Sequence, residues 1–326
     1  MLFGVGLAIQ AETLARRGSV PRLLTRRLLV LLAFGLVHMF LLFNGDILTE
    51  YALAGLIALP FVLLPPKITL SAAAAALMLF LSLSALPVSL PFPNSEWMAQ
   101  HVIEARRAYG QGSFTDVFRF RIAEVQSIGV YLAFIFARTI SLILFGAWAW
   151  KSGLIGERGP PAKLHRTVGW LGLVVGLLLS WLDGAGLAAP LVLPPVVAHI
   201  IDLFAPIALA VSYSALALGY LANSSNIVVA WAAPVGRMAF TNYIAQSLLL
   251  GLLFYGYGFG LMGRIGVVAG VAISVTIFLG QMIFSRWWLR HHNYGPLEWL
   301  WRTGMYGTPQ PWRKTVGDPP WGRART

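Results

Sequence analysis

Three ionisable side chains lie in or beside two apolar runs of the chain, and their types suit acid–base chemistry. The runs cover residues 28–43 and 47–64; His38 lies in the first, Asp46 ends the turn between them, and Glu50 opens the second. An ionisable group costs a few kcal/mol in hydrocarbon, so one found there is a candidate for function. A carboxylate beside a histidine fixes its tautomer and stabilises the imidazolium. We therefore expect His38 to be a general base, with Asp46 and Glu50 among the candidates for its carboxylate partner.

Asp46 and His38 each also have an interpretation without chemistry. Asp46 follows Asn44-Gly45 and precedes an apolar run, which is the position of a helix N-cap. A histidine between membrane helices can simply hydrogen-bond to its neighbour, as polar groups in bundles do.

Three further polar residues lie deep in other apolar runs. Arg138 is in the middle of the run 127–150 and needs a carboxylate or a water-filled cavity. By depth its acidic neighbours are Glu50 and Asp202, and the alternative is a structural ion pair between helices. His199 and Asp202 are three residues apart, so they share a helix face at about the depth of His38. We expect Arg138, His199 and Asp202 to bind substrate, with Asp202 also a candidate partner for His38.

The segment VGRMAFTNYIAQSLL brings several hydrogen-bonding groups into one membrane helix. Asn242 and Gln246 lie on one face of it because they are four residues apart. With Arg237 and Tyr243 they are expected to line a polar path for substrate; the alternative is that they hold helices together.

The elements that must position these side chains are membrane helices. The chain has 326 residues, of which 58% are hydrophobic and 11% charged, with a mean hydropathy of +0.73, which excludes an ordinary water-soluble globule. At 1.5 Å per residue the two opening runs are each about 25 Å long, close to the roughly 30 Å of a hydrocarbon core. We predict an all-α transmembrane bundle with a partial helix at 1–11 and eight full spans: 28–43, 47–64, 68–87, 127–150, 167–184, 196–222, 236–257 and 264–285.

Two stretches outside the spans complete the predicted organisation. Residues 1–294 form the transmembrane domain, which includes a polar insert at 89–126, and 295–326 form a C-terminal tail. The insert is expected to fold as two short amphipathic helices around Gly110-Gln111-Gly112, with Ser113 and Asp116 spaced as in a capping box.

The distribution of charge predicts orientation and excludes some partners. The net charge is +12, and 18 of the 24 basic residues fall on one side of the predicted spans. Cytoplasmic loops are rich in Lys and Arg, so the C-terminus is expected in the cytoplasm and the insert outside. Basic residues dispersed among short loops do not make a nucleic-acid surface. With no cysteine and no HExxH motif, we expect no disulfide, no thiol nucleophile and no metal site.

Four segments resemble, in order and spacing, the YeiB-like family of bacterial inner-membrane proteins: LFGVGL, RRLLVLLAFGLVHMFLLFNGDILTEYAL, VGRMAFTNYIAQS and FSRWWLRHHNYGPLEWLWR. That family, a domain of unknown function, is grouped with transmembrane acyltransferases such as the lysosomal heparan-glucosaminide acetyltransferases and the acyltransferase-3 proteins. Its motif positions correspond here to His38, Gly45, Asp46, Tyr51, Arg237, Asn242, Tyr243, Gln246, Gly295, Pro296, Glu298 and Trp299. Relatives begin with a helix carrying a Leu-Asp-x-x-Arg-Gly-like stretch, which this sequence lacks, so a first helix is expected to be missing from it.

The resemblance implies a multi-pass protein of the bacterial inner membrane that passes an acyl group from a cytoplasmic donor, such as acyl-CoA, to an acceptor at the periplasmic face. The leading hypothesis is therefore a transmembrane O- or N-acyltransferase with His38 as base, no bound cofactor, and the lipid bilayer and two small molecules as partners. One alternative is a transporter or flippase in which the same groups bind a solute or relay protons. Another is a non-catalytic membrane protein whose outer insert docks a partner.

Overall fold

The computed structural model describes residues 1–15, 20–85, 95–156, 159–188, 195–221 and 227–314. Within these ranges the regular structure is helical throughout, apart from one isolated bridge between His292 and Arg313, so the predicted all-α class is confirmed. The helices are α1 (Leu2–Ala15), α2 (Val20–Leu41), α3 (Leu48–Val62), α4 (Pro66–Ala85), α5 (Ser95–Gln111), α6 (Phe114–Lys151), α7 (Ala162–Ala188), α8 (Pro195–Leu221), α9 (Ile227–Arg237), α10 (Ala239–Phe254), α11 (Val267–His291) and α12 (Pro296–Tyr306).

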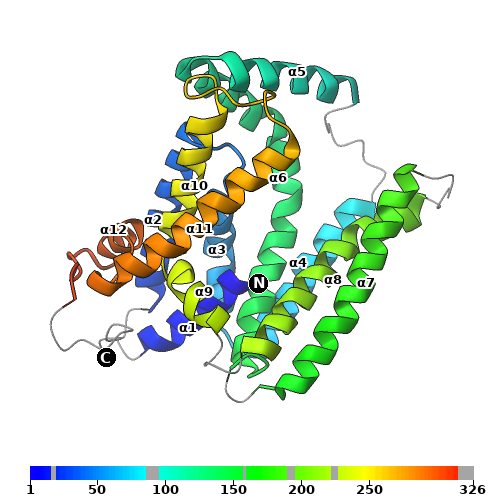
Figure 1. Cartoon of the computed structure of the whole chain (residues 1–326). Helices are drawn as coiled ribbons and strands as arrows, with labels where there is room; N and C mark the ends of the chain where they lie inside the picture. The colour runs from blue at the N-terminus through cyan, green and yellow to red at the C-terminus, as the bar shows by residue number, and fades with distance from the viewer. Residues whose placement is uncertain (16–19, 86–94, 157–158, 189–194, 222–226, 315–326) are drawn as a thin grey trace. The chain divides into compact units, whose positions relative to one another are not determined.

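The chain divides into two compact units, one made of residues 1–152 and 231–326 and the other of residues 153–230. The helix α12 falls within the stretch predicted as a tail, and it packs against α2 in the first unit. In the second unit α7 and α8 lie side by side (Figure 1). Glycines on α7 allow the close approach, since a Cβ at Gly169 would lie 2.6 Å from Cγ of Leu216.

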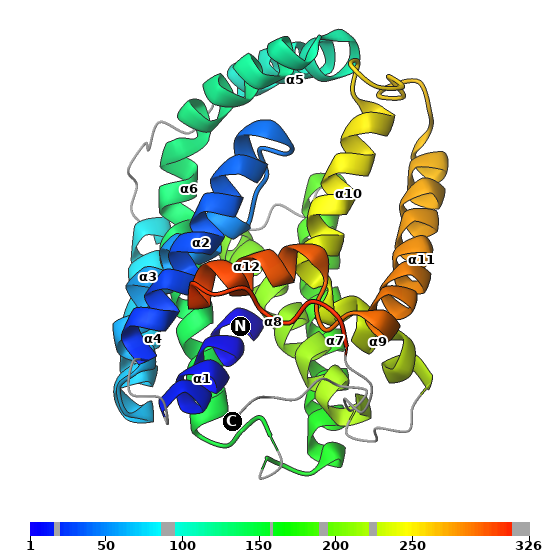
Figure 2. The same cartoon turned by 90° about the vertical axis from the view of Figure 1, so that its left-hand side faces the viewer.

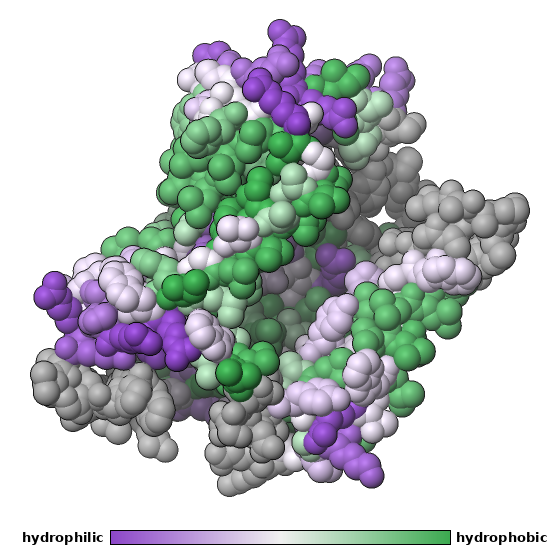
Figure 3. Space-filling model, viewed as in Figure 1, coloured by the Kyte–Doolittle hydropathy of each residue, from purple (hydrophilic) through white to green (hydrophobic). Residues whose placement is uncertain are grey.

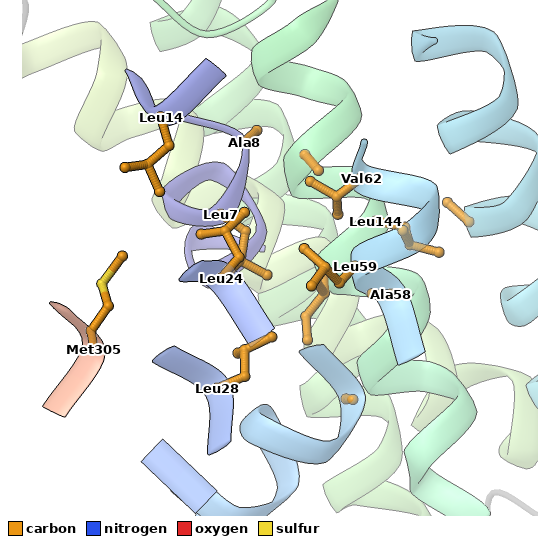
Figure 4. Close-up of a cluster of buried hydrophobic side chains, with 14 residues drawn as sticks. Leu7, Ala8, Leu14, Leu24, Leu28, Ala58, Leu59, Val62, Leu144 and Met305 are labelled. Atoms are coloured by element: carbon orange, nitrogen blue, oxygen red, sulfur yellow. The ribbon is translucent and has the colours of Figure 1, made fainter. Parts of the chain in front are cut away.

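The core of the first unit is a cluster of aliphatic side chains from α1, α2, α3, α4 and α6 (Figure 4). Leu7, Leu24 and Leu28 are fully enclosed there, and Met305 of α12 closes one side. Helix α1 reaches α6 through glycine: a Cβ at Gly4 would lie 1.8 Å from the carbonyl oxygen of Ile143. Small residues of this kind let membrane helices pack backbone against backbone.

Helix α6 begins at the predicted capping box. The backbone N–H of Asp116 donates to Oγ of Ser113 at 3.3 Å, and the backbone N–H of Ser113 donates to the Asp116 carboxylate at 2.9 Å. The helix then continues unbroken to Lys151. The second insert helix and the fourth predicted span are thus one element, because no proline or turn sequence interrupts them.

Apolar helices and an apolar surface identify a membrane protein. Among the described residues four helical segments are long and apolar enough to cross a bilayer: Val20–Leu41, Pro66–Leu83, Ala162–Leu182 and Val267–His291. Shorter apolar helices include α3 and α10. On α11 the side chains of Val267 and Val268 are more than 80% exposed. Figure 3 shows hydrophobic residues over α10 and α11, with hydrophilic ones over α5 at one end and near the C-terminal end of α11 at the other. Such a face suits lipid.

Candidate functional site

The site lies between α2 and α10, which are joined at one end by α12 (Figure 2). The indole N–H of Trp301 donates to the carbonyl oxygen of Arg27 on α2 at 3.0 Å. Glu298 accepts a hydrogen bond from the backbone N–H of Thr241 at 3.0 Å and one from its hydroxyl at 2.5 Å. A carboxylate is favourable there because the first N–H groups of a helix lack partners within it. Between these ends Phe34 and Phe240 meet edge to face at 5.1 Å.

At the other end α5 and α6 hold both helices. The fully buried guanidinium of Arg121 donates from Nη1 to the carbonyl oxygen of Leu41 at 2.6 Å and from Nη2 to that of Leu42 at 2.7 Å. These carbonyls end α2 and have no partner in the helix. Just beyond α10, the backbone N–H of Gly256 donates to the carbonyl oxygen of Tyr109 on α5 at 2.7 Å. The ends of α2 and α10 are therefore fixed independently of the contacts between them.

Three side chains from three segments meet between these supports. Nδ1 of His38 on α2 lies 2.7 Å from Oδ1 of Asp46, which belongs to the loop before α3. Nε2 of the same ring lies 2.8 Å from Oγ of Ser247 on α10. A carboxylate, an imidazole and a hydroxyl in this order form the hydrogen-bond chain that activates a hydroxyl in acyl-transfer enzymes on unrelated folds.

The carboxylate of Asp46 serves two partners through separate oxygens. Oδ1 faces His38, while Oδ2 accepts the backbone N–H of Thr49 in the first turn of α3 at 2.6 Å. Asp46 thus bonds the histidine and also the first turn of α3, but the N-cap position of that helix is Ile47, one residue later than expected. Burial raises the pKa of this loop carboxyl, but the hydrogen bonds from His38 and from the backbone of Thr49 and Leu48 outweigh it and hold the pKa below the ordinary value. Asp46 is therefore ionised near neutral pH.

Glycine at position 35 makes room for this arrangement. A Cβ there would lie 2.5 Å from the backbone N of Thr49 and 3.0 Å from Oδ2 of Asp46. The loop before α3 can close onto α2 only because that side chain is missing.

Tyr243 completes the surroundings of the histidine. Its ring lies 4.8 Å from the ring of His38, centroid to centroid, and its hydroxyl lies 3.4 Å from Oδ1 of Asp46. Of the residues expected to act in the site, the structure thus brings together His38, Asp46 and Tyr243.

The other expected carboxylate and the expected deep arginine lie elsewhere in the same unit. Glu50 accepts a hydrogen bond from the hydroxyl of Thr139 on α6. The guanidinium of Arg138 lies 5.8 Å from the centre of the Phe80 ring. Within the described ranges the ion pairs at or below 4.0 Å are His38 with Asp46 and His101 with Glu124, so Glu50 pairs with neither His38 nor Arg138. His199 and Asp202 belong to α8 in the second unit, and their side chains lie outside the described part of the chain.

Of the remaining expected residues, Asn242 and Gln246 join α10 to α11. Nδ2 of Asn242 donates to Oγ of Ser285 at 3.0 Å, and Nε2 of Gln246 donates to Oε1 of Gln281 at 2.7 Å. Both partners belong to α11, so these contacts match the alternative in which the polar groups join helices. Arg237, at the end of α9, donates to the carbonyl oxygen of Asn293 at 3.3 Å.

Two residues of the site were not among the expected ones. Ser247 is one of several polar residues in its segment, and nothing local to it indicates a histidine 209 positions earlier. Arg121 reads in the sequence as one more cation of the outer insert. The one indication of its role was position: Arg121 lies on α6, from which a long side chain can reach the end of α2 in the hairpin of α2 and α3.

Comparison with known proteins places the chain in a family. The chain is 36% identical to the uncharacterized protein YxaH of Bacillus subtilis (strain 168) over 95% of its own length and 78% of that protein. Residues 149–308 match the family model described as "Protein of unknown function (DUF418)". The chain belongs to the DUF418 family.

Two further relatives show how far the similarity extends. The uncharacterized protein YeiB of Escherichia coli (strain K12) is 29% identical over 93% of this chain and 79% of its own length. An uncharacterized 39.9 kDa protein in the amylase 3′ region of Bacillus acidopullulyticus is 28% identical over 95% of this chain and 79% of its own length. No solved structure matches the chain. The expected resemblance to a YeiB-like family is confirmed, and chemistry in this DUF418 chain has to be argued from the site.

Proposed function

We propose that this protein is a membrane-bound acyltransferase, which moves an acyl group from a cytoplasmic donor such as acyl-CoA to a hydroxyl or amine acceptor at the periplasmic face. The observation that carries the proposal is His38 with a buried carboxylate on one ring nitrogen and a hydroxyl on the other. General-base catalysis by a positioned histidine typically contributes about 10²–10⁴ in rate. In this proposal His38 takes the proton of the attacking group, and Asp46 orients the ring and balances its positive charge.

The placement of the site along α2 supports transfer across the membrane. His38 is 18 residues from the start of α2 at Val20, which is about 27 Å at 1.5 Å per residue. The bulk of the basic residues belongs to the opposite side of the predicted spans, which is the cytoplasmic side under the charge rule. In this topology the C-terminus is cytoplasmic and α5 faces the periplasm.

Arginines near α12 support an anionic donor on the cytoplasmic side. The guanidinium of Arg27 lies 4.4 Å from the centre of the Trp301 ring, and that of Arg302 lies 4.6 Å from that of the Tyr294 ring. Arginine binds phosphate well because its planar donors match phosphate oxygens. The phosphates of an acyl-CoA would meet these arginines while its thioester is carried towards His38.

The test uses the purified full chain in proteoliposomes loaded with ¹⁴C-acetyl-CoA, with a bacterial envelope extract outside. We expect transfer of label to an external acceptor and a loss of about 10²-fold or more in His38→Ala. The control is His291→Ala, because His291 is exposed at the end of α11 and, among the described contacts, its ring meets only Trp287, one turn earlier on the same helix. Equal transfer in wild type and His38→Ala contradicts the proposal. Movement of an unmodified solute along a gradient, without acyl transfer, identifies a transporter instead.

A further inference from the structure

We propose that Ser247 is the nucleophile of this site and carries the acyl group as a serine ester between donor and acceptor. The inference rests on the proposed acyl transfer and names its covalent intermediate. It is drawn from the hydrogen bonds that link Asp46, His38 and Ser247, from the exposure of those three side chains, and from a comparison with Ser274 on the adjacent helix α11.

The direction of each hydrogen bond follows from the carboxylate. An ionised carboxylate can only accept, so Nδ1 of His38 carries the proton in the 2.7 Å contact with Asp46. In a neutral imidazole the other nitrogen is then an acceptor. The hydroxyl of Ser247 must therefore donate to Nε2, at 2.8 Å. This is the arrangement in which a histidine removes the proton of a hydroxyl as the oxygen attacks.

The competing partner of the hydroxyl is weaker. Oγ of Ser247 also lies 3.3 Å from the carbonyl oxygen of Tyr243, one turn earlier on α10. Serines in membrane helices commonly bond that carbonyl, and Ser274 on α11 does so at 3.0 Å to Gly270. In Ser247 the contact with the imidazole is shorter by half an ångström than the contact with its own helix, so the histidine is the preferred acceptor.

The three hydrogen-bonded side chains differ in their exposure to solvent. The side chains of His38 and Asp46 are both 0% exposed. Ser247 is half-buried, and the next residue, Leu248, is 48% exposed on the same helix. An incoming acyl group therefore meets the hydroxyl before it can meet the imidazole. An attack by His38 itself on the donor would require the ring to leave an enclosed position.

The proposed reaction has two balanced halves. First, Oγ of Ser247 attacks the thioester carbonyl as Nε2 of His38 takes the hydroxyl proton; the C–S bond breaks, and the proton passes from His38 to the leaving thiolate. Second, His38 takes a proton from the acceptor hydroxyl or amine, which attacks the serine ester. The bond from the acyl carbon to Oγ breaks, and the proton returns from His38 to Oγ. No oxidant, metal or further reactant is consumed.

The first experiment measures the nucleophile with an alkyl fluorophosphonate, which phosphonylates activated serines. The purified full chain is labelled and the modified residue is identified by peptide mass spectrometry. In the wild type we expect phosphonylation at Ser247 and none at Ser274. The variant Ser247→Ala should not be labelled at all, and labelling of His38→Gln should be slower by about 10²-fold or more. Ser274→Ala is the matched control, because it removes a hydroxyl that bonds only its own helix, and it should label like wild type. No labelling at Ser247, or an equal rate in His38→Gln, overturns the proposal.

The second experiment uses the absence of cysteine from the sequence. Ser247→Cys introduces a single thiol, and its alkylation by iodoacetamide near neutral pH reports whether the adjacent imidazole generates the thiolate. We expect the rate to fall about tenfold or more when His38→Gln is added, whereas the rate of Ser274→Cys should not change with the same addition. A rate in Ser247→Cys that is indifferent to His38→Gln overturns the proposal without relying on Ser247→Ala to fold.

These measurements distinguish the intermediate from the function on which it rests. If ¹⁴C-acetyl transfer depends on His38 but persists in Ser247→Ala, the acyl group passes directly to the acceptor; the covalent proposal fails and the transferase stands. If Ser247 is phosphonylated in a His38-dependent way but no acceptor receives label, the nucleophile stands and the transferase fails.

Discussion

Nδ1 of His38 and Oδ1 of Asp46 lie 2.7 Å apart, and both side chains are completely enclosed. Eight residues separate them in the chain, so the contact needs only the turn from α2 into α3. The imidazole is therefore aligned before any substrate binds, and its other ring nitrogen lies at hydrogen-bond distance from the hydroxyl of Ser247 on α10.

Asp46→Asn separates the orienting role of the carboxylate from its role in the fold. An amide retains an oxygen for the N–H of Thr49, but its neutral group neither fixes the histidine tautomer nor balances the imidazolium. We expect acyl transfer to fall about 10²–10⁴-fold, with a lower thermal unfolding midpoint at pH 6 but a smaller loss of stability than in Asp46→Ala. Asp46→Ala should lose activity and more stability, because the acceptor for the backbone N–H of Thr49 is gone. Radiolabel transfer and thermal unfolding of both variants check this, and a fully active Asp46→Asn contradicts it.

The acid side of the stability profile should report the same carboxylate. The folded pKa of Asp46 is lowered, so its contribution to stability is present above the ordinary value of 3.8 and is lost as the pH falls through the folded pKa. We expect the thermal midpoint of the wild type to exceed that of Asp46→Asn at pH 6, and the gap to close as the pH falls below 3.8. Thermal unfolding in detergent across this range is the measurement; a gap that is independent of pH contradicts the lowered pKa.

Gly35→Ala tests the space between α2 and the loop. The added methyl would lie 2.5 Å from the backbone N of Thr49, so either the loop or the helix must move. We expect a loss of about 1–3 kcal/mol in unfolding free energy and a fall of tenfold or more in transfer, because Asp46 follows the loop. In Gly280→Ala on α11 the new Cβ meets nothing within 4 Å, and this control should be neutral or slightly more stable.

Arg121→Lys should show what the buried guanidinium does for the site. A lysine ammonium cannot reproduce the fork that binds the carbonyls of Leu41 and Leu42 together. We expect a loss of roughly 2 kcal/mol or more in unfolding free energy and reduced transfer, since the end of α2 lies next to His38. Arg119→Lys, at an exposed position on the same helix, is the control. Equal thermal midpoints for the two variants would contradict the role given to Arg121.

Tyr243→Phe keeps the ring against His38 and removes the hydroxyl. The lost contact with Asp46 is long, at 3.4 Å, and the carboxylate keeps its two shorter bonds. We expect transfer to fall less than tenfold, and Tyr243→Ala to cost much more because the ring packing goes with it. Initial rates of label transfer decide between the two; a total loss in Tyr243→Phe would assign the hydroxyl a direct chemical role.

The sequence predicted those features that depend on neighbours along the chain. Ser113 and Asp116 are three residues apart and His38 and Asp46 flank one turn, so spacing alone brings each pair together. Depth in the membrane was a poorer guide to pairing: it placed Glu50 level with Arg138, and Glu50 does bond Thr139, the next residue of α6. Among the described residues, however, Glu50 forms no ion pair with Arg138, because depth does not say which way a side chain points around a helix. The pairing of His38 with Ser247 depends on α2 and α10 meeting across 209 positions, which no local pattern encodes.

The contacts of α12 with both α2 and α10 have a consequence for movement of these two helices. Arg27 is 11 residues from His38 and Thr241 is six residues from Ser247, or about 16 Å and 9 Å along their helices. Helix α12, which bonds Arg27 through Trp301 and Thr241 through Glu298, thus fixes α2 and α10 at a point distant from the reacting atoms. A tilt of α2 or α10 about α12 would have to break the contacts of α5 and α6 at their other ends, so we expect the distance between imidazole and hydroxyl to depend on both supports together.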